Sequence, residues 1–206
     1  MWPSDLLPDL NVSRESIERL EIYHALLLKW QKAINLVSGK TLDEAWVRHF
    51  ADSAQIVAHI PDGVKVIADM GSGAGFPALV VAILRPDIAV HVIESDERKC
   101  QFMRTVSRET GVSVRIHTSR IESVDPQEIK PDLITARALA SVVQLFDYSA
   151  PFLAQNPALQ MLFLKGAQVE GELREARELY DFGVEQFASV TNSDAAIVRF
   201  GSIKKR

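Results

Sequence analysis

The strongest constraint on the fold lies beyond Gly63, where short apolar runs alternate with stretches of helical spacing. The apolar runs that are short enough for single strands span 64–69, 89–94, 113–117, 133–135 and 159–164. Helical patterns follow them at 77–84, 96–110, 141–153 and 168–182. Strands that alternate with helices form parallel sheets that are covered on both faces. The sequence therefore predicts an α/β fold, and two further strands at 184–190 and 196–200 close the sheet like a hairpin.

The first 62 residues have a different pattern. Apolar residues recur at helical spacing over 16–31 and 42–60, with Ser13 or Ser16 as possible N-caps and Pro61-Asp62-Gly63 as a stop signal. We expect an N-terminal helical extension, 1–62, that joins a core at 63–206. Because 206 residues with 47% hydrophobic content suit one core, we expect a single domain.

Composition excludes several classes of protein. No run of eighteen apolar residues occurs, and the N-terminus lacks a basic stretch followed by an apolar one, so we expect a cytoplasmic protein without a membrane span or secretory signal. The single cysteine, Cys100, excludes an internal disulfide and a metal site built from several thiolates, and we expect no metal. The net charge of −4 means that any nucleic-acid contact must use a local patch.

A glycine-rich loop, Asp69-Met70-Gly71-Ser72-Gly73-Ala74-Gly75, stands where a strand turns into a helix. Glycine permits positive φ and lets a ligand lie directly on the backbone. Dinucleotide sites use G-x-G-x-x-G to aim helix N–H groups at pyrophosphate, but Phe76 occupies the third position of that pattern. The spacing suits S-adenosylmethionine, whose ammonium group would meet Asp69 directly or through water. We therefore expect a class I methyltransferase, with a Rossmann-like, seven-stranded, mostly parallel sheet.

Further polar residues follow the other strands. Glu94 ends the strand after the loop, where an acid can accept hydrogen bonds from both ribose hydroxyls, or is simply exposed. Ile121-Glu122 and Arg137 also follow strands, where ligands gather in open α/β sheets, although Glu122 could merely begin a helix. Arg137 is the only charge among apolar neighbours and must be paired or face a ligand. Lys165 could line the same site or extend to solvent.

Two motifs that the chain lacks exclude classes of methyl acceptor. Methylation of an exocyclic base amine usually employs an Asn/Asp-Pro-Pro-aromatic turn after the fourth strand, where this chain has Thr135-Ala136-Arg137. Methylation at C5 of a pyrimidine needs a nucleophilic cysteine in a loop, whereas Cys100 falls within a helical pattern and is expected in the core. Hydroxyls, carboxylates, small amines and ring nitrogens such as guanine N7 remain, and N7 needs only alignment with the methyl group.

The chain resembles the ribosomal RNA small-subunit methyltransferase G family, also called glucose-inhibited division protein B. The resemblance runs in order from Trp30 to Gly166. Its segments are Trp30 to Asn35-Leu36, Trp46-Val47-Arg48-His49-Phe50-Ala51-Asp52-Ser53, Asp69 to Pro77, Arg85-Pro86-Asp87, Glu94-Ser95, Lys99, Phe102, Arg120-Ile121-Glu122, Ala136-Arg137-Ala138 and Leu164-Lys165-Gly166. The R-H-x-x-D-S segment is the specific part, because generic methyltransferases lack it. Ala78 and Ser119 replace glycines common in the family, and because both residues are small we expect cofactor binding to be retained.

This resemblance implies N7 methylation of guanine-527, in the 530 loop of bacterial 16S rRNA, and cofactor contacts at Gly71, Phe76, Ile121-Glu122 and Arg137. With the loop residues Asp69, Ser72, Gly73 and Gly75 and with Glu94, these complete the expected cofactor site. The expected partner is 16S rRNA or the 30S particle, bound by a monomer.

The same resemblance places Arg48 and His49 beside the cofactor, where they and Lys165 are candidates for RNA contact, although Arg48 and Asp52 could form only a surface pair. N7-methylguanine is cationic, so Arg137 and His49 are assigned to orientation rather than to contact with N7, and no catalytic residue is assigned. Two alternatives remain open: a methyltransferase of small molecules, and a non-catalytic nucleotide-binding regulatory protein.

Overall fold

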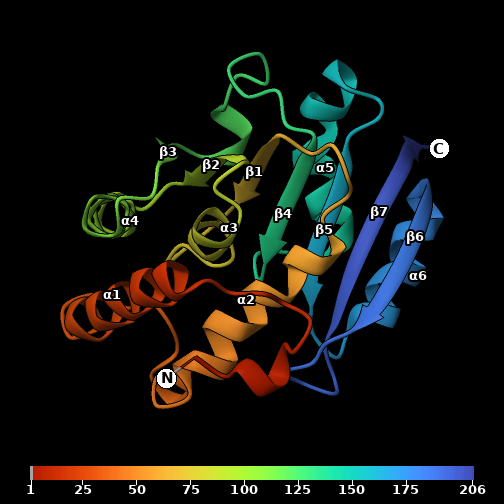
Figure 1. Ribbon diagram of the computed structural model, residues 1–206. Helices are drawn as coiled ribbons and strands as arrows, with labels where there is room; N and C mark the ends of the chain where they lie inside the picture. Colours follow the sequence, from red (N-terminus) through yellow and green to blue (C-terminus); the bar gives the residue numbers. More distant parts are fainter. Residues whose placement is uncertain (1) are drawn as a thin grey trace.

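The computed structural model describes residues 2–206. Their strands form one seven-stranded sheet (Figure 1). The strands are β1 (Val66–Met70), β2 (Ala89–Glu94), β3 (Val114–Thr118), β4 (Leu133–Arg137), β5 (Gln160–Lys165), β6 (Tyr180–Ala188) and β7 (Ala196–Lys205). Their order across the sheet is β3-β2-β1-β4-β5-β7-β6. Strands β1 to β5 pair in parallel, whereas β7 runs antiparallel to both β5 and β6. The predicted fold class and the hairpin ending are confirmed.

Helices cover both faces of the sheet. They are α1 (Arg14–Gln31), α2 (Asp52–Ala54), α3 (Ala78–Leu84), α4 (Glu97–Thr110), α5 (Val142–Gln155) and α6 (Val169–Leu179). Short 3-10 turns lie at Ser4–Leu6, Gly39–Thr41, Gln55–His59 and Ile121–Ser123, and a π-helical turn spans Trp46–Ala51. Ser13 caps α1 by accepting a hydrogen bond from the Ser16 N–H, as one of the two predicted caps would. None of the helices in residues 2–206 has the length and apolar content to cross a membrane.

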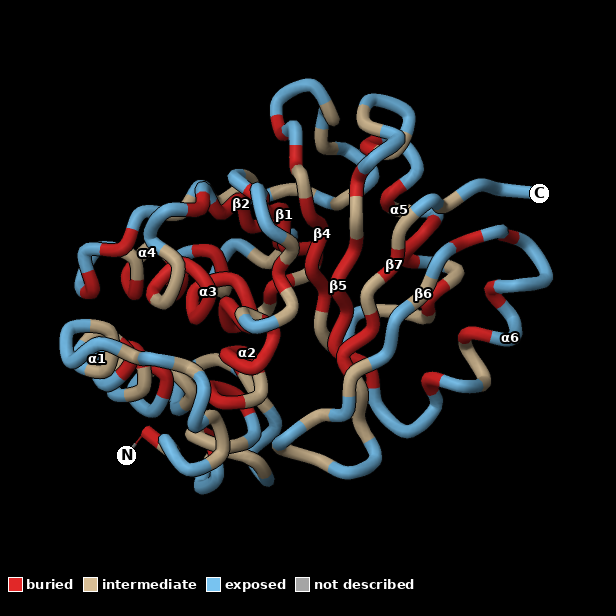
Figure 2. The backbone as a smooth tube through the Cα atoms, turned by 45° about the vertical axis from the view of Figure 1, so that its right-hand side comes forward, coloured by how far each residue is buried: buried red, intermediate tan, exposed pale blue. Residues whose placement is uncertain are grey.

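Successive strand residues point to opposite faces, and the two faces build separate hydrophobic clusters. On one face, Ile67, Val90 and Leu133 pack with α1, α3 and α4. On the other face, Met70 and Ile134 pack with α5 and α6. Figure 2 shows the central strands and α3 buried, whereas α1, α4 and α6 are exposed along part of their surface. Cys100 is buried in the first cluster, as the sequence predicts.

Two predicted elements differ from the structure. The helix expected at 168–182 ends at Leu179, because Tyr180 and Phe182 are buried while Asp181 and Gly183 are exposed, and this alternation belongs to β6. The helix expected at 42–60 is split into π-helical, α-helical and 3-10 turns. Ser53–Ile56 are buried consecutively, so this segment is enclosed on several sides and not on one helical face.

The order of the strands fixes where a ligand can bind. From β1 the chain moves outward to β2 and β3, and it then returns to place β4 on the other side of β1. Connections therefore leave β1 and β4 in opposite directions and open a crevice at their carboxyl ends. Open α/β sheets bind ligands at such a switch point.

Candidate functional site

A cavity of 740 Å³ opens at the carboxyl ends of β1, β2 and β4, within the size range of small-molecule sites. Most of the residues singled out from the sequence line it together. They are Gly71, Ser72, Gly73, Phe76, Glu94, Ile121, Glu122, Arg137, Lys165, Arg48 and His49. Asp69 and Gly75 lie behind this lining. The four basic candidates, Arg48, His49, Arg137 and Lys165, thus face one cavity and are not scattered over the molecule.

The glycine loop needs its glycines for two different reasons. Gly71, Gly73 and Gly75 all have positive φ, at +66°, +57° and +91°. A Cβ on Gly75 would lie 2.4 Å from Leu79 Cδ1, so this glycine allows α3 to pack closely against the loop. A Cβ on Gly73 would meet no atom within 4 Å, and Gly73 lines the cavity. Gly73 therefore presents bare backbone to a ligand.

Asp69 lies beneath the loop and is fully buried. One carboxylate oxygen accepts a hydrogen bond from the Ser72 hydroxyl, and the other accepts one from Thr135 Oγ1 at 2.6 Å. Burial raises the pKa of the Asp69 carboxyl to about 7, and the two hydroxyl donors only partly offset this shift. Asp69 thus supports the loop from beneath through the Ser72 hydroxyl and does not itself line the cavity.

Helix α1 holds the other side of the loop. Tyr23 is fully buried, and its hydroxyl donates a hydrogen bond of 2.5 Å to the carbonyl oxygen of Ala74. The same ring stacks on Phe76, with centroids 5.1 Å apart. The N-terminal extension therefore reaches the loop directly through this side chain.

Glu94 lines the cavity beside the glycine loop. Its Oε2 accepts a hydrogen bond from the Gly73 N–H at 2.9 Å, and its Oε1 accepts one from the Asp96 N–H at 2.9 Å. Each carboxylate oxygen can accept a second bond. Ile121 and Glu122 lie nearby in a 3-10 turn, with Glu122 exposed. An acid beside an open glycine backbone fits a ribose, and the cavity therefore suits an adenosine-containing ligand.

Phe76 forms a platform for the basic residues. Its ring is 2% exposed and lies between Tyr23 and His49, which stacks on it with centroids 5.3 Å apart. The Arg137 guanidinium carbon sits 5.0 Å from the centre of the Phe76 ring. Aromatic and cation–π contacts of this kind fix the orientation of both side chains.

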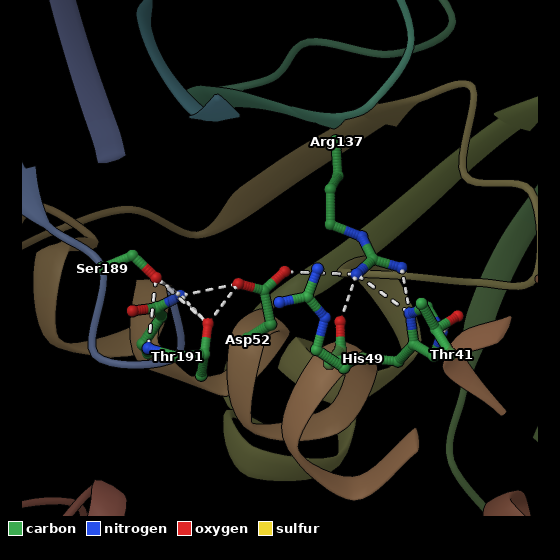
Figure 3. Close-up of polar contacts among 8 residues, drawn as sticks. Thr41, His49, Asp52, Arg137, Ser189 and Thr191 are labelled. Atoms are coloured by element: carbon green, nitrogen blue, oxygen red, sulfur yellow. Dashed lines mark hydrogen bonds and ion pairs between the residues drawn. The ribbon is translucent and has the colours of Figure 1, made fainter. Parts of the chain in front are cut away.

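Arg137 extends from the end of β4 to the segment that contains His49 and Asp52 (Figure 3). Its Nη1 donates to the Arg48 carbonyl oxygen at 3.2 Å and to Asp52 Oδ2 at 3.2 Å. Both Nη atoms lie 3.3 Å from His49 Nδ1. Asp52 thus pairs with Arg137 across 85 residues of sequence, and the local Arg48–Asp52 pair left open from the sequence is not formed.

The neighbours of His49 determine its protonation. A guanidinium group can only donate, so His49 Nδ1 must be the acceptor. The proton of the neutral ring is then on Nε2, which donates to Thr41 Oγ1 at 2.8 Å. Burial, followed by the charges of Arg137 and Arg48, lowers the pKa of His49 to about 4. At neutral pH both ring nitrogens are therefore occupied and the ring carries no charge.

Asp52 also connects Arg137 to the loop between β6 and β7. Its Oδ1 accepts hydrogen bonds from Thr191 Oγ1 at 2.7 Å and from Gln55 Nε2 at 2.9 Å. Gln55 Oε1 in turn accepts one from the Val190 N–H at 2.9 Å. Figure 3 shows this line of contacts running from Arg137 to Ser189. The network joins the N-terminal and C-terminal walls of the cavity.

The remaining basic candidates differ in exposure. Arg48 has an exposed side chain, whereas His49 and Lys165 are only 8% and 9% exposed. The Lys165 ammonium contacts Glu172 Oε2 at 2.5 Å and donates to the Ala140 carbonyl oxygen at 2.8 Å. Lys165 therefore holds the segment after β4, and of these three residues Arg48 is the one free to meet a large substrate.

Sequence reasoning missed the residues that organise this site: Tyr23, Thr41, Asp52, Gln55, Ser189 and Thr191. Tyr23 was visible only as part of an amphipathic helix. Asp52 belonged to the R-H-x-x-D-S segment, and the close spacing of an acid and a basic pair in that motif was the one signal in the sequence that could have identified it.

Comparison with protein families gives one description for nearly the whole chain. Residues 16–198 match the family described as rRNA small subunit methyltransferase G. A protein of that name from Rhodospirillum rubrum is 44% identical over 206 residues, which cover all of both chains. Another from Rhodospirillum centenum is 46% identical over 204 residues, or 98% of this chain and 92% of the relative.

Solved structures show the same fold. The O-methyltransferase TomG from Streptomyces achromogenes, solved in complex with S-adenosylmethionine, aligns with a TM-score of 0.59 at 14% identity. The alignment covers 97% of this chain and 93% of that protein. At this identity the likeness supports the class I methyltransferase fold alone.

Proposed function

Because the chain belongs to the rRNA small subunit methyltransferase G family, we propose that it transfers a methyl group from S-adenosylmethionine to N7 of guanine-527 in 16S rRNA. The full-length identity to relatives of that name supports the small-subunit rRNA as the substrate. We further propose that the protein acts as a monomer on the rRNA or the 30S particle.

The cofactor site in this proposal consists of the glycine loop and the ends of the adjacent strands. S-adenosylmethionine would supply a methyl group activated by a sulfonium. Gly71, Ser72 and Gly73 would contact its methionine part, above Asp69, and Glu94 would bind the ribose hydroxyls. Ile121 and Glu122 would border the adenine, and Phe76 and Arg137 would border the transferred methyl group.

One observation supports N7 above hydroxyl and amine acceptors: His49, the imidazole in the cluster around Arg137, is poorly suited to act as a general base. It uses Nδ1 to bind Arg137 and Nε2 to bind Thr41, and its pKa is lowered to about 4, while Asp52 pairs with Arg137. A hydroxyl or amine acceptor must lose a proton during methylation, which calls for a general base. Guanine N7 loses none, so a site that orients the base is sufficient.

In this proposal the residues act by orientation. Arg137 retains donors beyond those already bonded, because the guanidinium carries five N–H groups. These donors and the exposed side chain of Arg48 suit guanine O6 and RNA phosphates, the acceptors that arginine commonly binds. Phe76 and His49 hold Arg137 at a fixed angle while it does so.

The test is transfer of labelled methyl from S-adenosylmethionine to 16S rRNA and to 30S particles from cells that lack the modification. Borohydride and aniline cleavage, which breaks the strand at N7-methylguanosine, should map the label to guanine-527. Robust turnover of small molecules without any RNA labelling would favour the small-molecule alternative. Tight binding of NAD or FAD but not of S-adenosylmethionine in calorimetry would favour the nucleotide-binding regulatory protein.

A further inference from the structure

The positive charge of the sulfonium moves during the proposed methyl transfer, and this inference rests on that proposed function. The N7 lone pair forms a bond to the methyl carbon as the bond from carbon to sulfur breaks, with its electron pair remaining on sulfur. No proton is released. The positive charge therefore leaves the sulfonium and appears on the guanine ring, so the acceptor end of the cavity must tolerate a cationic base.

Arg137 lies at that end and is permanently charged. Its side chain is 17% exposed, so water screens it weakly. An unbalanced guanidinium beside the guanine would repel the developing cation and oppose transfer. The cavity must cancel this charge if Arg137 is to orient the base.

Asp52 provides the cancelling charge. Its Oδ2 lies 3.2 Å from Arg137 Nη1, and its own side chain is 18% exposed. His49, the other basic group in contact with Arg137, is neutral because its pKa is held near 4. Lys165, a buried cation in the lining, is likewise paired with Glu172. Arg137 and Lys165 thus each have an acidic partner.

We propose that Asp52 is a positioning residue that holds Arg137 toward the guanine and neutralises it, so that the site accepts a cationic, N7-methylated base. The other contacts of Asp52 suit this role. Thr191 and Gln55 donate to Oδ1, which leaves Oδ2 aimed at Arg137. The carboxylate cannot turn away without losing these bonds.

The experiment measures binding in the absence of cofactor. Two 16S rRNA fragments containing the 530 loop, one with guanine and one with N7-methylguanine at position 527, are titrated against each variant by filter binding. Because both fragments share the same general attraction to the protein, this contribution cancels in the ratio of the two affinities. The wild-type ratio should be near one, and Asp52→Asn should disfavour the methylated fragment by about tenfold, as expected for one uncancelled charge at this range.

A compensating variant separates charge from structure. The double variant Asp52→Asn with Arg137→Gln has no net charge at this point, so its ratio should return toward the wild-type value. Arg137→Gln alone leaves Asp52 unbalanced and should favour the methylated fragment. In turnover, Asp52→Asn should lower kcat more than it raises KM. Asp181→Asn, which removes an exposed partner of Arg206 outside the cavity, is the matched control and should leave both ratio and turnover unchanged.

The outcomes distinguish this inference from the proposed function. If the wild type labels RNA at a position other than guanine N7, the proposed function fails. If it labels N7 but the Asp52→Asn ratio matches the wild type, the inference is overturned. An altered ratio that the double variant does not restore would also overturn it, because Asp52 would then act only through structure. If Asp52→Asn does not fold, Arg137→Gln provides the test. Tighter binding of the methylated fragment supports the inference, and an unchanged affinity ratio overturns it.

Discussion

At the residue scale, burial shifts the pKa values of two side chains of the site in opposite directions. It raises the pKa of the Asp69 carboxyl to about 7 and lowers that of His49 to about 4. The cause is the same for both, because a buried charge loses its water. In each case the neutral form is favoured, which keeps His49 uncharged near neutral pH and brings Asp69 close to its midpoint.

Asp69→Asn should change how stability depends on pH. The folded pKa of Asp69 exceeds its usual value of 3.8, so folded protein binds more protons between pH 4 and 7, and its stability falls as pH rises through that window. Asparagine cannot ionise and lacks this loss. Relative to wild type, the variant should gain about 2 to 3 kcal/mol between pH 5 and 8, at about 1.4 kcal/mol per pKa unit. Urea denaturation at both pH values measures this change, and a constant difference would contradict it.

His49 should remain a neutral ring with its proton on Nε2 from pH 8 down to pH 5, and it should titrate near pH 4. Because its folded pKa lies below the usual 6.5, the unfolded chain takes up the proton first, and His49 lowers stability as pH falls from 6.5 to 4. Nitrogen-15 NMR of the imidazole ring reports both tautomer and pKa, with His49→Gln to assign the signals. A proton on Nδ1 would show that Arg137 does not bind there.

At the element scale, the glycine loop is packed from two sides, by Tyr23 of α1 and by Leu79 of α3. The strand, the loop and the following helix were all predictable, because their signals are local: an apolar run, closely spaced glycines and a helical pattern. The division of 42–60 into short helical turns was not predictable. The apolar residues of this segment do recur at helical spacing, but tertiary packing decides that other elements enclose it.

Two substitutions in this loop should separate packing from binding. Gly75→Ala should cost about 1 to 3 kcal/mol of stability, because φ is +91° and the new Cβ would meet Leu79. Gly73→Ala should cost less, because its Cβ meets nothing within 4 Å, but it should weaken S-adenosylmethionine binding by projecting into the cavity. Thermal unfolding and calorimetric titration of both variants provide the two readouts. Equal effects of the two substitutions on stability would contradict this division.

The residues of the candidate site that have a local signal in the sequence were predictable, and the others were not. The strand-end positions of Glu94 and Arg137 followed from the βαβ pattern, and both line the cavity. The partners of Arg137 did not follow, since His49 and Asp52 precede it by 88 and 85 residues and nothing local links them. Contacts at that separation depend on how the N-terminal segment crosses the end of the sheet.

At the scale of the whole molecule, the N-terminal extension is part of the core. Tyr23, Leu27 and Phe50 are fully buried in the same cluster as Leu79 and Phe102. We therefore propose that 1–62 and 63–206 form one domain and unfold together.

Removal of the extension tests this proposal. A fragment of residues 63–206 would expose the apolar faces of α3 and α4, and it should bind hydrophobic dye and lack a cooperative thermal transition. The full chain should unfold in one transition. A fragment that unfolds cooperatively would show that 63–206 is a domain by itself.

Thr191 donates a hydrogen bond to Asp52, and the Val190 N–H donates one to Gln55, so the site joins segments that are synthesised far apart in time. Residues 189–196 supply a wall of the cavity, although its glycine loop is made more than a hundred residues earlier. A growing polypeptide can form the loop while its distal hairpin is still inside the ribosomal tunnel, but it cannot finish the wall. Competence for methyl transfer thus requires that residues 189–196 have been synthesised and have left the tunnel.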